Sequence, residues 1–190
     1  MSTSAQRRGP GSRAGGDHPT RLELLASARQ IAERNGITAL TVDAVTKTAG
    51  HAKGTFYIHF EDRSDLLVEM HRRFHDELFA AIAKAAEALS EGPSRARLRI
   101  IAFLDGCRQQ TGVRSMLFQA RHDPVIAELA RQRNDEAARV LARDIETATS
   151  TPLETARLLV AATIEVAVQE LASRKRLPRL RSALLDMVPC

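Results

Sequence analysis

Aromatic residues are scarce in this 190-residue chain: tryptophan is absent and only 4% of the residues are aromatic. A globular core must therefore be built mainly from leucine, alanine, isoleucine and valine. Residues typical of strands are also few, whereas long tracts are rich in Ala, Leu, Arg and Glu. That composition is typical of helical proteins, so we expect an all-α fold of about nine helices.

Cysteines and long apolar runs are scarce as well. The two cysteines, Cys107 and Cys190, form neither a C-x-x-C pair nor a zinc-binding spacing. No stretch reaches the length of about 18 apolar residues that a membrane-spanning helix needs, and the basic N-terminus lacks the apolar core of an export signal. We therefore expect a cytoplasmic protein with no membrane partner, no metal site and no cofactor.

Positive charge is present in modest excess, with 28 Lys and Arg residues against 23 Asp and Glu residues and a formal net charge of +5. This balance suits a nucleic-acid partner, although an arginine-rich composition alone would give the same value. Charge therefore permits DNA binding without identifying it, and the assignment depends on a motif.

Two short helices separated by a tight turn are predicted between Thr41 and about Ile58. Thr41 is a good N-cap for the first helix. Gly50 can end that helix in the left-handed conformation, and the second helix follows from about Lys53. This arrangement is the helix-turn-helix pattern, in which the second helix enters the major groove of DNA.

The segment AGHAKGTFYIHF, residues 49–60, resembles the helix-turn-helix of the TetR family of bacterial transcriptional regulators, and the likeness runs from Thr20 to about Leu67. The resemblance implies a homodimer that binds a palindromic DNA operator, as a repressor rather than an enzyme. It also implies an unknown small-molecule effector, bound in the C-terminal bundle. The residues expected to contact DNA are Thr41, His51, Ala52, Lys53, Gly54, Thr55, Tyr57, His59 and Arg63.

Two positions depart from the family pattern. His51 stands where a small apolar residue usually fills the turn, and Ala52 stands where Ser or Thr usually caps the recognition helix. The missing cap costs about 1 kcal/mol, and Ala52 can offer DNA only a contact with a thymine methyl group. Gly54 costs roughly 1 kcal/mol inside a helix, which either a close approach to DNA or a tolerant helix start would explain.

The chain divides into three predicted parts. Residues 1–19 form a disordered basic arm, residues 20–66 form the DNA-binding domain, and residues 67–190 form the effector-binding and dimerisation domain. A capping box, Thr20-x-x-Glu23, predicts where the first helix starts. Asp62 is the predicted N-cap of a long helix of about 27 residues that links the two domains.

The second domain offers candidates for a ligand pocket and for a subunit interface. The predicted pocket residues are His71, Phe74, Phe103, Cys107, Met116, Phe118, Gln119, Leu159 and Thr163. The helix from Pro152 to about Arg174 is apolar on nearly every side, which predicts burial all round, partly against a second subunit. The predicted interface residues are Ala161, Ile164, Val168, Leu180 and Leu184.

Other interpretations of these residues remain open. His71 and His75 have the i, i+4 spacing of metal ligands, but no further ligand completes a site. A partly buried, hydrogen-bonded histidine is the preferred interpretation of His71, and a contact to an effector or to the DNA-binding unit is the alternative. Cys107 could sense an oxidant if a basic group lay beside it. We find no catalytic constellation. The rival class is a helical ligand-binding or protein-interaction module without specific DNA binding. The sequence predicts neither the operator and the regulated genes nor the effector, the direction of regulation or the number of dimers per operator.

Overall fold

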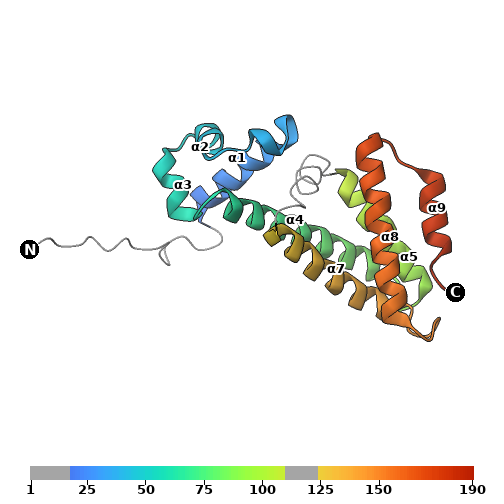
Figure 1. Cartoon of the computed structure of the whole chain (residues 1–190). Coiled ribbons are helices and arrows are strands. Elements are labelled where there is room, and N and C mark those ends of the chain that lie inside the picture. The colour runs from blue at the N-terminus through green and yellow to red at the C-terminus, as the bar shows by residue number, and fades with distance from the viewer. Residues whose placement is uncertain (1–17, 110–123) are drawn as a thin grey trace, which may run out of the picture. The chain divides into compact units, whose positions relative to one another are not determined.

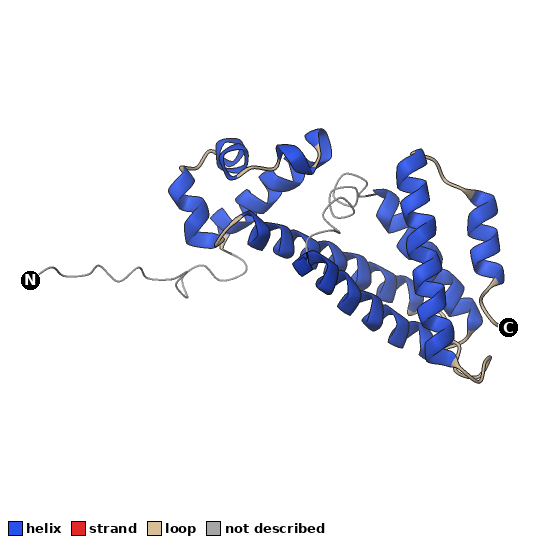
Figure 2. Cartoon of the chain, viewed as in Figure 1, coloured by secondary structure: helices blue, strands red, loops and turns tan. Residues whose placement is uncertain are grey.

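The computed structural model describes residues 18–109 and 124–190, and within those ranges the chain is helical with no strand (Figures 1 and 2). The predicted all-α fold is confirmed. The described ranges hold eight α-helices and one short 3₁₀ helix. They form two compact units, one ending at Met70 and one beginning at His71. Nearly all of the predicted basic arm, with Arg7, Arg8 and Arg13, lies outside the described residues.

The first unit is the predicted helix-turn-helix domain. Its elements are α1 (Pro19–Asn35), η1 (Ile37–Ala39), α2 (Val42–Ala49) and α3 (Lys53–His59), followed by the start of α4 (Arg63–Ala86). The side chains at its centre that are fully buried are those of Leu24, Leu40, Val45, Phe56 and Phe60. Burying a side chain of this size stabilises the fold by about 1.5–3 kcal/mol. The core thus fixes which face of α3 points inward.

Helix α1 begins one residue earlier than its predicted capping box. Its N-cap is His18, whose Nδ1 accepts a hydrogen bond from the Thr20 backbone N–H at 3.3 Å. The capping box predicted from Thr20 and Glu23 is therefore wrong. The carboxylate of Glu23 is instead directed to His51, as described below.

Helix α4 begins with a reciprocal cap between two aspartates. Asp62 Oδ1 accepts from the Asp65 N–H at 2.9 Å, and Asp65 Oδ2 accepts from the Glu61 N–H at 3.1 Å. The predicted cap at Asp62 is confirmed, because its carboxylate satisfies the Asp65 N–H, a backbone donor of the first turn. The helix ends at Ala86, after 24 residues, which corresponds to a length of about 36 Å.

The described part of the second unit contains the rest of α4 and four further helices. They are α5 (Pro93–Gln109), α7 (Pro124–Asp144), α8 (Pro152–Ser173) and α9 (Pro178–Asp186). Helix α8 packs against α5, α7 and α9, and α9 runs beside it (Figure 1). The described helices therefore enclose a core in which α8 is the central element.

A buried network of charged side chains joins α9 to α8. Glu170 and Arg181 are 1% and 4% exposed, and two hydrogen bonds of 2.7 and 2.8 Å join them. Glu170 also accepts from the Leu177 N–H at 2.8 Å, and Arg181 donates to Asp105 on α5. Although burial alone raises the pKa of Glu170, its bonds to Arg181 and Leu177 hold that pKa below its ordinary value. The carboxylate is therefore charged, and its partners are satisfied.

Candidate functional site

The turn of the helix-turn-helix forms as its sequence predicts. The Thr41 hydroxyl accepts from the Ala44 N–H at 3.1 Å and caps α2. Gly50 adopts φ 72° and ψ 25°, the left-handed conformation that glycine reaches at little cost. Ala52 precedes α3 and provides no side-chain cap. The turn is thus locally determined, except at the uncapped start of α3.

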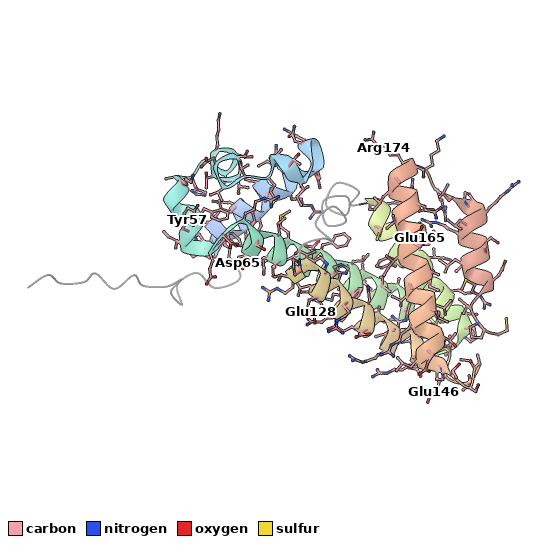
Figure 3. The ribbon with its side chains drawn as sticks, viewed as in Figure 1. Tyr57, Asp65, Glu128, Glu146, Glu165 and Arg174 are labelled. Carbon is pink, nitrogen blue, oxygen red and sulfur yellow. The ribbon has the colours of Figure 1, made fainter. Side chains whose placement is uncertain are left out.

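One face of α3 is open to solvent. Phe56 and His59 are buried, whereas Lys53, Gly54, Tyr57 and Ile58 are exposed. Tyr57 and Ile58 are 50% and 58% exposed, and Figure 3 labels the Tyr57 side chain on α3. Lys53 and Tyr57 are four residues apart, as are Gly54 and Ile58, so the exposed positions lie on one face of the helix. Together with Ala52 they form a surface of one cation, one phenol, one aliphatic group and an exposed stretch of backbone.

Gly54 opens the backbone of α3 to this face. A Cβ atom added at Gly54 would meet no atom of the protein within 4 Å. Packing inside the chain therefore does not require glycine here, even though glycine is unfavourable in a helix. The open space is consistent with a partner that approaches the backbone from outside.

Lys53 is held at the start of α3 by an exposed ion pair. Its Nζ lies 2.8 Å from Asp43 Oδ1, and both side chains are more than half exposed. The hydrogen bond and charge of Asp43 raise the Lys53 pKa, so its ammonium is charged. Exposed pairs stabilise proteins by only about 0–1 kcal/mol. The lysine can therefore exchange this carboxylate for a phosphate at little cost.

His51 is used inside the first unit. Its Nε2–H donates to Glu23 Oε2 at 2.7 Å, which ties the turn to α1. Its ring is half-buried. In this structure the imidazole is therefore not directed freely outward, as a base-reading side chain would be.

Arg63 and His59 are also engaged within the unit. Arg63 donates to the carbonyl oxygens of Ile37 and Leu40 at 2.9 and 2.6 Å. His59 is 9% exposed, and its ring lies 4.9 Å from that of His18. Burial is the main cause that lowers the His59 pKa, and nearby cationic groups lower it further. Among the other predicted DNA contacts, Thr41 and Ala52 are exposed and Thr55 is half-buried.

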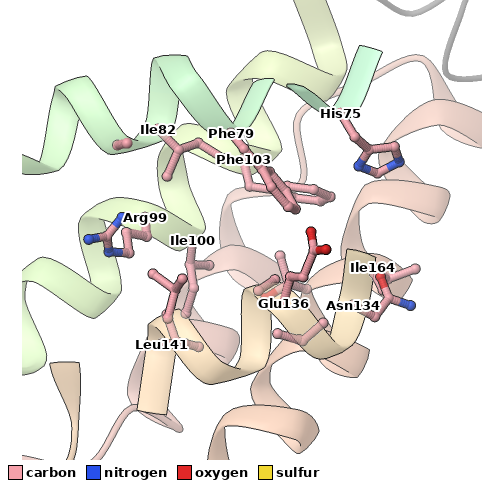
Figure 4. Close-up of a pocket in the computed structure, with 15 residues that line it drawn as sticks. His75, Phe79, Ile82, Arg99, Ile100, Phe103, Asn134, Glu136, Leu141 and Ile164 are labelled. Atoms are coloured by element: carbon pink, nitrogen blue, oxygen red, sulfur yellow. The ribbon is translucent and has the colours of Figure 1, made fainter. Parts of the chain in front are cut away.

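The second unit contains a cavity of about 330 Å³ (Figure 4). Helices α4, α5, α7 and α8 all contribute to its wall. The lining residues are His75, Phe79, Ile82, Ala83, Arg99, Ile100, Phe103, Asn134, Glu136, Ala137, Val140, Leu141, Val160, Thr163 and Ile164. The lining is mostly apolar, with few polar groups, as is usual for small-molecule sites.

Two of the predicted pocket residues, Phe103 and Thr163, line this cavity. Four others are buried in the core instead and are absent from its lining: His71, Phe74, Cys107 and Leu159. The remaining three, Met116, Phe118 and Gln119, lie outside the described residues. Apolar periodicity identified the inward faces of the helices, but it could not separate core positions from the cavity wall.

The two histidines of α4 pack on each other. The rings of His71 and His75 lie 4.4 Å apart, and both are buried. Within residues 18–109 and 124–190, no group of three or more potential metal-binding side chains occurs. In the same ranges no helix has the length and apolar character needed to cross a membrane.

Helix α8 is not buried on every side in this protomer. Leu158 is 67% exposed, and Ala161 is also exposed. Of the other predicted interface residues, Ile164, Val168 and Leu180 are half-buried, and Leu184 is buried at 2%. Ile164 also lines the cavity, so it faces the interior of its own unit. Leu158 is not among the predicted interface residues, although it is the most exposed large apolar residue described.

Comparison with known proteins finds sequence similarity between the first unit and bacterial regulatory proteins. Residues 24–70 match the tetR family of bacterial regulatory proteins. An 87-residue stretch is 32% identical to the HTH-type transcriptional repressor NemR of Escherichia coli strain K12, covering 46% of this chain and 42% of NemR. A 113-residue stretch is 26% identical to the HTH-type transcriptional activator FasR of Mycolicibacterium smegmatis, covering 55% and 52%. This chain spans about half the length of these curated relatives.

The fold of the whole chain also has counterparts among solved structures. A transcriptional regulator from Rhodococcus sp. Rha1 aligns with a TM-score of 0.72 at 19% identity, over 88% of this chain and 93% of the other. At that identity the likeness concerns the fold.

Proposed function

Because residues 24–70 match the tetR family of bacterial regulatory proteins, we propose that the chain is a member of this family and that it binds a palindromic DNA operator as a homodimer. It represses transcription until a small molecule occupies the cavity of its second unit. The observation that carries this proposal is the solvent-exposed face of α3, with Lys53, Gly54 and Tyr57 side by side. No catalytic step is involved, and the site of action is the cytoplasm, where the DNA lies.

The DNA contacts divide into those that position and those that specify. Lys53 meets a phosphate after leaving Asp43, and the Tyr57 hydroxyl donates to a second phosphate oxygen. Gly54 allows the backbone to come close to the DNA. Ala52 and Ile58 offer only apolar surface, which suits the methyl group of thymine. His51 and Arg63 act indirectly by holding the turn and the start of α4 in place.

The dimer forms through the exposed side of α8. Leu158 and Ala161 present apolar surface there that the protomer leaves uncovered. When a two-fold axis relates two copies of the chain, this surface of one copy packs against the same surface of the other. It would also place two copies of α3 about 34 Å apart, or a multiple of that distance, over an operator of matching symmetry.

The ligand acts through a shift between two conformers. Helix α4 contains Arg63 of the first unit, and it also supplies four residues of the cavity wall. A ligand in the cavity can shift the equilibrium only by its difference in affinity for the two conformers. Repression is the proposed direction because NemR, the more similar of the two relatives over its matched stretch, is a repressor.

A protein-interaction module without specific DNA binding is the second candidate. The observation in its favour is that three predicted DNA contacts, His51, His59 and Arg63, are engaged within the unit. Salt dependence separates the two candidates, because each phosphate contact steepens the fall of DNA affinity with salt.

The test is a selection of bound fragments from genomic DNA by the purified chain at near-physiological salt. Lys53→Ala/Tyr57→Ala removes both proposed phosphate contacts. Lys175→Ala is a matched control, because Lys175 is an exposed lysine of the second unit. We expect a palindromic motif with wild type and with Lys175→Ala but not with the double variant. Lys53→Ala alone should reduce the salt slope by about one. No enrichment over the double variant would favour the interaction module.

A further inference from the structure

The size of the cavity limits what it can hold. A cavity of about 150 Å³ lined by apolar side chains has room for benzene. The cavity here, at about 330 Å³, is roughly twice as large and lies at the small end of the range for ligand pockets. It therefore has room for two rings.

The wall of the cavity is chemically divided. Phe79 on α4 and Phe103 on α5 both project into it (Figure 4). Opposite them, α7 and α8 contribute aliphatic side chains, among them Leu141 and Ile164. Both phenylalanines are only half-buried, although they point into the bundle. The part of each ring that stays exposed favours an aromatic ligand, which can pack edge-on or face-on against it.

The arginine and the glutamate of the described lining are already matched by opposite charges. Arg99 donates to Asp144 at 2.7 Å, and Asp144 is itself 2% exposed. Glu136 accepts from Arg133 at 2.9 Å. A charged ligand would lose its hydration without gaining a counter-charge from these residues, which is strongly unfavourable.

The neutral polar groups allow one or two hydrogen bonds. The Thr163 hydroxyl donates to the Leu159 carbonyl oxygen at 2.7 Å, so it faces a ligand as an acceptor. Asn134 contributes an amide, which can both donate and accept. These groups suit a ligand with a single hydroxyl or carbonyl.

From these four features we infer that the cavity binds an uncharged, two-ring aromatic compound with at most one or two hydrogen-bonding groups. The inference rests on the effector site of the proposed function and names the chemical class of its ligand. Compounds of the same shape that carry a carboxylate or an ammonium group are excluded as ligands of the cavity.

The test compares probes of equal shape and different charge. Isothermal titration calorimetry on the full chain at pH 7 would measure binding of 1-naphthol, 1-naphthoate and 1-naphthylmethylammonium. We expect 1-naphthol to bind at least about 10-fold more tightly than either ion. A preference for an ion, or no binding by 1-naphthol, would overturn the inference.

Two variants locate the binding. Val160→Phe fills the cavity and should abolish binding of 1-naphthol, whereas Val125→Phe, at an exposed site outside the lining, should not change it. Phe103→Leu keeps an apolar side chain and guards against a misfolded first variant. It should weaken 1-naphthol about 2- to 10-fold and leave the aliphatic probe 1-decalol unchanged. Equal effects on both probes would refute the aromatic preference.

A third measurement separates this inference from the proposed function. The wild-type chain bound to its selected operator is titrated with 1-naphthol, and release of DNA is followed by fluorescence anisotropy. Release supports both proposals. Binding of 1-naphthol by a chain that binds no operator would refute the regulator and leave the ligand class standing. Operator binding without any affinity for 1-naphthol would refute the ligand class alone.

Discussion

The substitution Gly54→Ala adds one methyl group, and we expect it to raise stability while it weakens DNA binding. The added methyl group would meet no atom of the protein within 4 Å. Alanine is favoured over glycine inside a helix by roughly 0.5–1 kcal/mol. Because Gly54 is the second residue of a seven-residue helix, we expect the lower value, about 0.5 kcal/mol. For a chain of this length that corresponds to a rise in melting temperature of roughly 1–2 °C.

The same methyl group should weaken DNA binding. If the backbone of α3 lies against the DNA at Gly54, an added Cβ atom would hold that backbone away from the DNA. A charge-assisted hydrogen bond from the backbone to a phosphate would then be lost. Such a bond contributes about 1.5–3 kcal/mol, which corresponds to a roughly 10- to 150-fold loss of affinity. Gly54→Ser should lose at least as much, because its side chain is larger.

Thermal unfolding and fluorescence anisotropy with the selected operator measure the two effects. Gly106→Ala is the contrasting control in the second unit, because its Cβ would lie 2.3 Å from Leu78 Cδ1. That variant should lose about 1–3 kcal/mol of stability by overpacking while DNA affinity is retained. A Gly54→Ala protein that is more stable and binds the operator as tightly as wild type would refute the close approach of DNA at Gly54.

Three further substitutions test other residues. In the first, uracil replaces thymine at single positions of the operator. At one symmetric pair of positions, the affinity of wild type should fall about 4-fold per half-site, which is the effect of one buried methyl group. Ile58→Ala should abolish that sensitivity. In the second, the lowered pKa of His59 means that the unfolded state binds more protons, so stability should be full above pH 6.5 and fall below it, toward the folded-state pKa. His59→Gln should flatten this dependence in denaturant unfolding between pH 7.5 and 5.5, and an unchanged slope would exclude His59 as its source. In the third, Arg181→Met leaves Glu170 buried without its guanidinium partner and should cost about 3–5 kcal/mol in chemical unfolding; a smaller loss would mean that water reaches the carboxylate.

The parts of the fold that the sequence predicted depend on neighbours a few residues away. Thr41, Gly50 and Asp62 each act on backbone groups within four positions. Caps and turns of this kind can be recognised from the residue type and its spacing. The predicted start of α3 at Lys53 is confirmed, and its end at His59 lies one residue beyond the prediction.

The cavity could not be predicted in the same way. Phe74 and Phe79 both lie on α4 and are both apolar, yet the first is in the core and the second lines the cavity. The difference depends on which helices pack opposite each residue, and no periodicity within α4 contains that information. Ile58 could have been found, since it follows Gly54 by four residues and therefore shares its face.

The two departures around Glu23 have a single cause. Sequence rules assign Glu23 to the cap of α1 and leave the unusual His51 without compensation. In the structure Glu23 binds His51, and His18 supplies the cap of α1 in its place. Because α1 begins at Pro19, Thr20 lies inside the helix and is not its N-cap, which leaves the Glu23 carboxylate for His51. The polar group gained at position 51 is therefore used in packing α1 against the turn. Under the proposed function, the choice of operator would then depend on the exposed face of α3, from Ala52 to Ile58.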